Sequence, residues 1–515
     1  MLGNGDTMRI TNKVMQNNAL ANINRNKELQ DNLNTQLATG KKIYKPSDDP
    51  VTAIRALRLR NDVSHVTQYY KKNVPDAKSW LELTESAVKT TVSVVKDMIE
   101  KCEKGSNDTL TAGDRQIIVD SLVQLAEEAY STGDADFAGR YIFTGFRTDT
   151  SLTFGADTSK KYNLTEILET DQAEATQYVS VDTASSSLLN ISESSYEGAY
   201  AVGENDIKAI EYKRVRLAYD DIDVTTQPSI KLLDSDFNEL GITANVSVAT
   251  DKEAAYKNME NATGLSAVLI PGTGELLLSN DLYDLVKERN IKLSLSYDKT
   301  NWTANNLRPE HYFNARTYEE DGTVIEYNPQ YLTTGKVGQD IEYQVGYSQY
   351  ITVNTNAEDV FKHGIGREVS EIKDLANYLQ SVEAIRDKLK GMKKDSSYTD
   401  AQLETIEHDY EAADKAATLL RDQLQKKFSS AITSMQGYLN TTNDAVTLIG
   451  NRASRLELID NRLESQQTTF KTLQSENEDA DATEVAVQLS SAGVSYQAAL
   501  MATGDMIKET LLNYI

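Results

Sequence analysis

The chain has 515 residues, a net charge of -25 and an apolar fraction of 39%. This length allows several hydrophobic cores, because one core seldom exceeds about 250–300 residues. The acidic balance excludes DNA, RNA and anionic membranes as main partners, since phosphate binding needs a basic surface.

The sequence also lacks the signals of a membrane protein. No apolar run reaches the roughly 18 residues of a membrane-spanning helix, so we expect no membrane insertion. Residues 1–39 contain no continuous apolar segment of the kind found in a cleaved signal peptide. We therefore expect a protein that is cytosolic or exported without such a signal.

The first predicted helix covers residues 8–40 and has a sparse apolar stripe. Its members are Ile10, Val14, Ala21, Leu29, Leu33 and Leu37. Asparagine fills much of the remaining helix surface, so the isolated helix is only marginally stable. We expect this helix to need a partner.

A polar, proline-containing segment then interrupts the helical pattern. It consists of Lys45, Pro46, Ser47, Asp48, Asp49 and Pro50. Proline suits the first turn of a helix, so a new helix is predicted to begin at Pro50. We interpret the segment as an inter-domain joint.

Helices are predicted next at residues 50–72, 76–104 and 112–131, followed by strand and turn structure at 139–146. The second of these helices has an unbroken three-four repeat, which indicates a buried seam. The repeat comprises Ala77, Leu81, Thr84, Val88, Thr91, Val95, Met98 and Cys102. Cys102 is the only cysteine, so no internal disulfide can form, and its place on the seam predicts a core residue.

Residues 151–360 differ in character from both flanks. They contain 16 of the 27 tyrosines and short alternating segments such as 341–345 and 351–353. This pattern predicts a β-rich insert. Its 16 basic and 34 acidic residues account for -18 of the total charge, which fits a solvent-facing domain.

Long helical repeats return after the insert, and no proline follows residue 331. Bundle helices are predicted at 399–442 and 445–473. Residues 363–367, with the sequence His-Gly-Ile-Gly-Arg, are interpreted as a domain hinge because the glycine pattern lacks the other residues of a phosphate loop.

The last predicted helix, residues 483–515, begins after a capping box formed by Asp481 and Glu484. Its apolar stripe comprises Val485, Leu489, Tyr496, Leu500, Ile507, Leu511 and Tyr514. Burying seven such side chains yields roughly 10–20 kcal/mol, whereas ordering about 30 residues costs roughly 30–60 kcal/mol. We therefore expect the terminal helices to pair, with 151–360 at the far end of the molecule, and to need neighbouring copies for full order.

The predicted fold is mainly α with a β-rich insert. Paired terminal helices comprise 8–40 with 480–515, and a coiled-coil helix bundle comprises 41–150 with 361–479. The insert at 151–360 forms a separate outer domain.

Candidate catalytic or metal-binding groups are few. The four histidines show no His-Glu-x-x-His pattern and are interpreted as surface or packing residues; they are His65, His311, His363 and His408. The aspartates between residues 220 and 236 lack the glycine and distal glutamate of an EF-hand loop. We expect no enzyme activity, no cofactor and no metal.

Several short motifs resemble the flagellin superfamily. They are Met8-Arg9-Ile10-Thr11, the segment 45–50, Glu478-Asp479-Ala480-Asp481, Tyr496-Gln497-Ala498-Ala499-Leu500 and Leu511-Leu512-Asn513-Tyr514-Ile515. Residues 139–146 resemble the members that join hook to filament more than filament flagellin. The resemblance covers about 300 residues in two terminal blocks.

This resemblance implies a secreted structural component of the bacterial flagellum, exported unfolded by the type III apparatus and needed for motility. It implies terminal helices in the inner tube and a variable outer domain. Implied partners are further copies in a ring, a neighbouring hook-associated protein, flagellin, the export apparatus and an export chaperone. The axial interface would comprise the two apolar stripes, with 45–50 as the joint between the tubes.

Two other functions remain open. One is the filament subunit itself, which assembly into long filaments would distinguish from a short junction layer. The other is a secreted coiled-coil effector or translocator, although the long apolar segment expected of such a protein is missing.

Overall fold

The computed structural model describes residues 12–107, 110–180, 182–183, 186–188, 202–250, 252–260, 262–318 and 321–512. The chain divides into two compact units. Unit 1 comprises residues 1–76, 344–350 and 455–515, and unit 2 comprises 77–343 and 351–454. The division into three domains predicted from the sequence stays a prediction.

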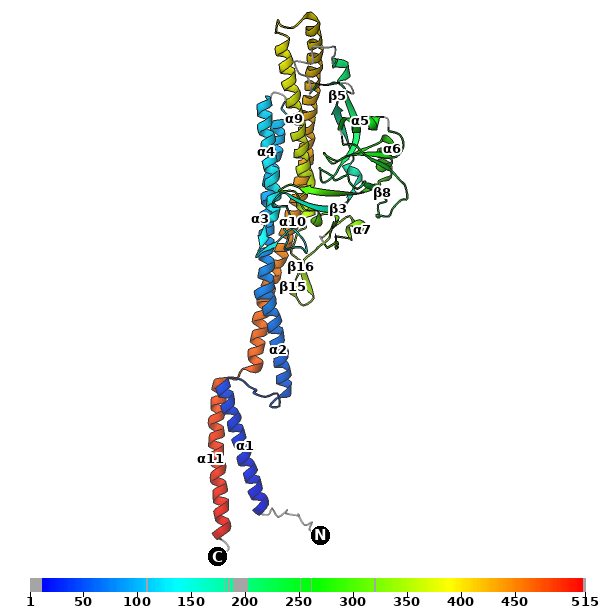
Figure 1. Ribbon diagram of the computed structural model, residues 1–515. Helices are drawn as coiled ribbons and strands as arrows, with labels where there is room; N and C mark the ends of the chain where they lie inside the picture. Colours follow the sequence, from blue (N-terminus) through cyan, green and yellow to red (C-terminus); the bar gives the residue numbers. More distant parts are fainter. Residues whose placement is uncertain are drawn as a thin grey trace. The chain divides into compact units, whose positions relative to one another are not determined.

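Unit 1 is helical. It contains α1 (Asn12–Thr39), α2 (Pro50–Gln68), the π-helical turn η1 (Tyr69–Asn73), α11 (Ala482–Leu512) and the C-terminal part of α10 (Asp400–Glu478). Helices α1 and α11 lie side by side (Figure 1), so the predicted pairing of the terminal helices is confirmed for the described residues.

The break predicted between 72 and 76 is wrong, because α2 continues through η1 into α3 (Val74–Gly105). The amide of Val74 donates to the carbonyl of Tyr69, five residues earlier. Pro75, which follows, has no amide hydrogen to donate. The wider π turn therefore carries the helix past the proline without a break.

Unit 2 contains a bundle of α3 residues 77–105, α4 (Ala112–Ser131), α9 (His363–Met392) and the N-terminal part of α10. All eight members of the α3 repeat are at most 1% exposed, which confirms the predicted seam. A charged group also joins three helices: Glu383 of α9 accepts from Arg115 of α4 and Arg421 of α10, each at 2.6 Å.

One prediction for this region is wrong. Helix α10 is one continuous helix of 79 residues rather than two, and the Thr441 and Thr442 hydroxyls donate to the carbonyls of Gly437 and Tyr438 within it instead of capping a new helix. Residues 363–367 form the first turn of α9, and their interpretation as a hinge stays a prediction. Their glycines give room to tyrosines: a Cβ at Gly364 would lie 1.9 Å from the Tyr438 hydroxyl, and the Gly366 amide donates to the Tyr130 hydroxyl.

The insert is built from two five-stranded sheets. The first has the order β4 (Glu174–Val179), β7 (Ala209–Arg216), β11 (Glu275–Leu278), β10 (Ser266–Ile270) and β9 (Asn245–Val248). Only the β9–β10 pair is parallel, and α5 (Lys252–Glu260) connects these two strands. The second has the order β14 (Val324–Tyr327), β13 (Asn314–Tyr318), β3 (Thr158–Leu168), β12 (Lys292–Trp302) and β8 (Ser229–Leu233), all antiparallel.

The two sheets share one core. Leu164 and Leu295 of the second sheet pack in the same cluster as Leu269 and Leu276 of the first, together with α6 (Asn280–Arg289). The other face of the first sheet packs against α5 through a separate cluster that includes Tyr256. The fold is therefore mainly α with a β-rich insert, as predicted.

The remaining described elements are short. They are the hairpins β1 (Asp136–Phe137) with β2 (Arg140–Tyr141), β5 (Asp182–Thr183) with β6 (Ser186–Ser187), and β15 (Glu342–Gly346) with β16 (Gln349–Thr352), and the helices α7 (Tyr331–Thr334) and α8 (Ala357–Val360). The hairpins β1–β2 and β15–β16 occupy positions where the sequence predicts strand and turn structure.

Burial of Cys102 generates the first prediction. Its side chain is fully buried, and desolvation raises the pKa of the thiol to about 12, so the reactive thiolate is absent at neutral pH. The folded protein should not react with a maleimide near pH 7.5, whereas the urea-unfolded chain should react completely.

Cys102→Ala should lower the free energy of unfolding by about 1 kcal/mol, the cost of a small cavity. Rapid labelling of the native protein would contradict this assignment.

Candidate assembly site

The pairing face between α1 and α11 follows a heptad pattern on both helices. On α1 it comprises Ala19, Ile23, Asn26, Gln30 and Leu33, and on α11 it comprises Val485, Leu489, Ala492, Tyr496, Ala499 and Thr503. These residues recur at steps of four and three, as in an antiparallel or parallel two-helix seam. The α1 face therefore differs from the predicted α1 stripe, of whose described members it includes Leu33 alone.

This seam buries little. Among the side chains that the structure describes on these two helices, Leu33, Val485 and Ala492 are buried, with Ala480 and Leu489 packed against them. Asn26 and Gln30 occupy seam positions that apolar residues fill in a stable coiled coil. The hairpin is therefore held by few apolar contacts, which agrees with the small burial expected from its sequence.

Much of the predicted stripe instead faces outward. On α1, Val14, Ala21, Leu29 and Leu37 are exposed, and on α11 Leu500 is 45% exposed, while Leu489 and Tyr496 are half-buried. Ile10 and Tyr514 lie outside the described residues, and the side chains of Ile507 and Leu511 do as well. The structure thus divides the stripe between a pairing face and an open face.

Sequence reasoning missed further apolar residues that the structure leaves exposed. Met15 and Leu20 of α1 are exposed, as are Val487, Val494 and Met501 of α11, the last three at 66%, 66% and 71%. Val487, Val494 and Met501 are spaced seven residues apart, which places them on one side of α11. This spacing was visible in the sequence. An open apolar face of this kind marks a site of protein association.

The joint between α1 and α2 is a capped turn. The Asp48 carboxylate accepts from the amides of Tyr44 and Lys45 at 3.2 and 2.8 Å. Asp49 is the N-cap of α2 and accepts from the amides of Val51 and Thr52, with Pro50 at the first helical position. The helix start at Pro50 is confirmed, while the role of residues 45–50 as an inter-domain joint stays a prediction.

Backbone hydrogen bonds between residues 40–42 and 478–480, here called the crossing, complete this joint. The segment after α1 runs beside the segment between α10 and α11: the Lys42 amide donates to the Glu478 carbonyl at 2.7 Å, and the Ala480 amide donates to the Gly40 carbonyl at 2.9 Å. Asp481 then caps α11 by accepting from the amides of Thr483 and Glu484. Two connections far apart in sequence are thus bound to each other.

Ion pairs reinforce the crossing. Arg60 of α2 binds both carboxylate oxygens of Glu478 at 2.7 Å, and Lys41 binds Asp479 at 2.5 Å. Glu478 is only 2% exposed, and its hydrogen bond with Arg60 lowers the pKa of the carboxyl below the usual 4.5. Sequence reasoning did not identify these pairs, because their members are more than 400 residues apart.

The described part of the chain shows no cluster of side chains suited to metal binding. No three carboxylate, imidazole or thiol side chains in the described ranges come close enough to hold a metal ion. His311 is buried and bound to the Ser151 carbonyl, His363 is half-buried and bound to the Tyr219 hydroxyl, and His65 and His408 are exposed. Among the described helices, none has the length and apolar content needed to cross a membrane.

The Arg60–Glu478 pair generates a second prediction. Glu478→Gln should destabilise the crossing by about 1–2 kcal/mol, less than the cost for a fully buried pair because the Arg60 side chain is 56% exposed. Hydrogen exchange at the amides of Lys42 and Ala480 should become correspondingly faster. Glu476→Gln, at an exposed position two residues earlier, is the matched control.

The same pair predicts a dependence on pH. Because the folded-state pKa of Glu478 is lowered, its stabilisation is fully present above pH 4.5 and is lost as the pH falls through the folded-state pKa. Exchange at the two amides, corrected for intrinsic rates, should therefore accelerate below pH 4.5 in the parent and less in Glu478→Gln. Equal acceleration in both proteins would exclude Glu478 as the cause.

Comparison with known proteins relates these helices to flagellar proteins. Residues 10–148 match the bacterial flagellin N-terminal helical region. The chain is 28% identical over 143 residues to flagellar hook-associated protein 3 of Salmonella typhimurium, which covers 28% of this chain and 45% of that protein. It is 31% identical over 121 residues to a flagellin of Clostridium tyrobutyricum, covering 24% of this chain and 32% of the flagellin.

The match is partial in length. The chain spans about half of the two hook-associated relatives, 45% of each. A crystal structure of FlgL from Xanthomonas campestris aligns with 81% of this chain and 99% of its own at 11% identity and a TM-score of 0.31. The similarity to flagellar proteins therefore rests on residues 10–148, which resemble the N-terminal helical region of bacterial flagellins.

Proposed function

We propose that the protein is a structural adaptor of the bacterial flagellum that joins hook to filament and polymerises through its terminal helices. The observation that carries this proposal is the set of exposed apolar side chains on α1 and α11, in a hairpin whose described residues include three buried apolar side chains. Apolar area left exposed on both helices gains free energy when neighbouring copies cover it. The partial identity to hook-associated protein 3 supports the junction role.

The proposed axial interface comprises Ile10, Val14, Ala21, Leu29, Leu33, Leu37, Leu489, Tyr496, Leu500, Ile507, Leu511 and Tyr514, and the structure adds Val487, Val494 and Met501 as candidates. Residues 45–50, with the Lys41 and Arg60 ion pairs, set the angle at the joint. The partners are further copies in a ring, the adjoining hook-associated protein and flagellin. Export through the flagellar type III apparatus with a chaperone places the protein outside the cell, in a role that needs no catalysis.

Removing residues 489–515 tests this proposal directly. The truncated monomer should melt within a few degrees of the full chain, because the hairpin contributes few buried contacts. Its ability to bind hook ends and accept flagellin should be lost. A large fall in melting temperature would place the terminal helices in the monomer core, and retained junction formation would refute their role in assembly.

A point substitution separates the open face from the hairpin. Val494→Asp should change monomer stability by less than about 0.5 kcal/mol, because the side chain is 66% exposed, but it should block assembly by placing a charge in an apolar contact. Ser495→Asp adds the same charge at the next exposed residue and is the matched control. Electron microscopy of hook ends with added protein distinguishes a short junction layer from long filaments, the latter identifying the chain as flagellin.

A further inference from the structure

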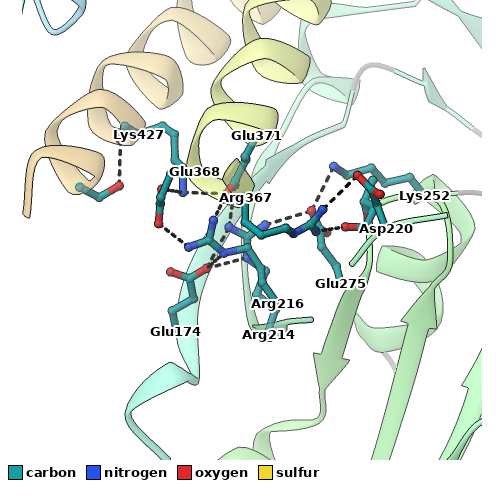
Figure 2. A network of polar contacts seen from close by, with 12 residues as sticks. Glu174, Arg214, Arg216, Asp220, Lys252, Glu275, Arg367, Glu368, Glu371 and Lys427 are labelled. Atoms are coloured by element: carbon teal, nitrogen blue, oxygen red, sulfur yellow. Dashed lines mark hydrogen bonds and ion pairs between the residues drawn. The ribbon is translucent and has the colours of Figure 1, made fainter. Parts of the chain in front are cut away.

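The insert contacts the bundle helices of unit 2 through a charged network (Figure 2). Two arginines of strand β7, Arg214 and Arg216, point from the same strand face because they are two residues apart. Glu368 and Glu371 stand three residues apart on α9, and therefore on one side of that helix. The strand thus presents two cations to two carboxylates of the helix.

Every charge in this contact has a partner. Arg214 binds Glu371 at 2.6 Å, and Arg216 binds Glu371 at 3.0 Å and Glu368 at 2.5 Å. Lys427 of α10 binds both glutamates at 2.6 Å, so a second helix contributes to the same cluster. Three elements of the fold therefore meet through one set of ion pairs.

The arginines are also held from the insert side. Arg214 binds Glu275 of β11 at 3.0 Å, and both arginines bind Glu174 of β4 at 3.0 Å. The Tyr256 hydroxyl donates to Glu275 at 2.9 Å. These contacts within the insert fix the orientation of both guanidinium groups. Each group therefore loses less conformational entropy when it pairs with a glutamate of α9.

A third arginine, Arg367 of α9, contacts two loops of the insert. Arg367 binds the Asp220 carboxylate at 3.2 Å and donates to the Thr273 carbonyl. Gly274, with a φ of +61°, allows this close approach, because a Cβ there would lie 2.1 Å from the Tyr219 carbonyl oxygen and 3.3 Å from the Arg367 guanidinium. The network therefore has ion pairs at two places along α9.

The central groups lie out of water. The side chains of Arg214 and Glu368 are 4% and 2% exposed, and Lys427 is 10% exposed. Burial acts to raise the pKa of Glu371, but Arg214, Lys427 and Arg216 outweigh it and hold this pKa well below its usual range. Glu371 is consequently ionised at neutral pH, and the pairing is a true ion-pair cluster.

Desolvation offsets much of the attraction within a buried ion pair, whereas a buried charge that loses its partner is strongly destabilising. Moving the insert along α9 and α10 would separate Arg214 and Arg216 from Glu368 and Glu371. We propose that the network is a clamp that holds the two-sheet insert in one position on α9 and α10 and makes insert and helix bundle unfold as one cooperative unit.

The two tryptophans permit a direct test. Trp80 lies in the bundle and Trp302 in the sheet core, so in a Trp80→Phe background the fluorescence of Trp302 reports the insert alone. Far-UV circular dichroism and maleimide labelling of Cys102 report the helices. In the parent, the urea transitions from all three probes should coincide.

Breaking the clamp should separate these transitions. In Glu371→Gln, Trp302 should become exposed at a lower urea concentration than that at which the helices melt and Cys102 becomes labelled. The matched control is Glu239→Gln, which removes a carboxylate from the exposed Lys231–Glu239 pair of the same insert. Coincident transitions in Glu371→Gln, or separated ones already in the parent, would overturn the proposal.

Lys427→Met keeps the test valid if Glu371→Gln fails to fold. The substitution lies on α10, outside the insert, and methionine keeps much of the apolar stem of lysine. Lys427→Met should also separate the urea transitions of Trp302 and the helices. Lys427→Arg, which retains the charge, should leave these transitions coincident, as in the parent. Separation by the arginine variant as well would indicate a packing effect and refute the clamp.

Discussion

A helix with an apolar stripe must bury that stripe against another surface, and the rest of this structure depends on whether the chain itself provides one. Helix α3 finds its partners inside unit 2, where its whole repeat from Ala77 to Cys102 is buried. Among the described residues, helices α1 and α11 pack against each other, and their seam buries Leu33, Val485 and Ala492. The proposal that neighbouring copies complete this seam follows from the contrast between these two parts of the chain.

Charged residues connect the elements in both units, but in different environments. At the crossing in unit 1, Arg60 is half exposed, so its pair with Glu478 is screened by water and contributes modestly. In unit 2, Arg214 and Glu368 lie almost entirely out of water. There the cost of an unpaired charge is high, and this cost restricts how the insert can sit on the helices.

The environment of each ion pair also sets what it can do. The half-exposed Arg60–Glu478 pair is screened by water and therefore contributes modestly to stability. The Arg214–Glu371 contact is largely excluded from water, so the loss of either partner would leave a buried charge that is strongly destabilising. We therefore expect substitutions in the network of unit 2 to cost more stability than substitutions at the crossing in unit 1.

Local patterns were sufficient to predict much of the fold. The three-four repeats identified the α3 seam and the pairing of the terminal helices, Pro50 marked a helix start, and the shift in composition after residue 150 identified the β-rich insert. Such signals succeed because the period of a helix or strand is a property of neighbouring residues. Local signals failed where the backbone had a second local solution, as at Pro75, where a π turn replaced the expected break.

The sequence by itself determined which segments are helical, which carry apolar stripes and how little the terminal stripes can bury. Only the tertiary structure decided which side of α1 faces α11, that Arg60 meets Glu478 and that Arg214 meets Glu371. The physical reason is that a stripe or a charge specifies the kind of partner a residue needs, whereas the identity of that partner depends on chain segments hundreds of residues away being brought together by the whole fold.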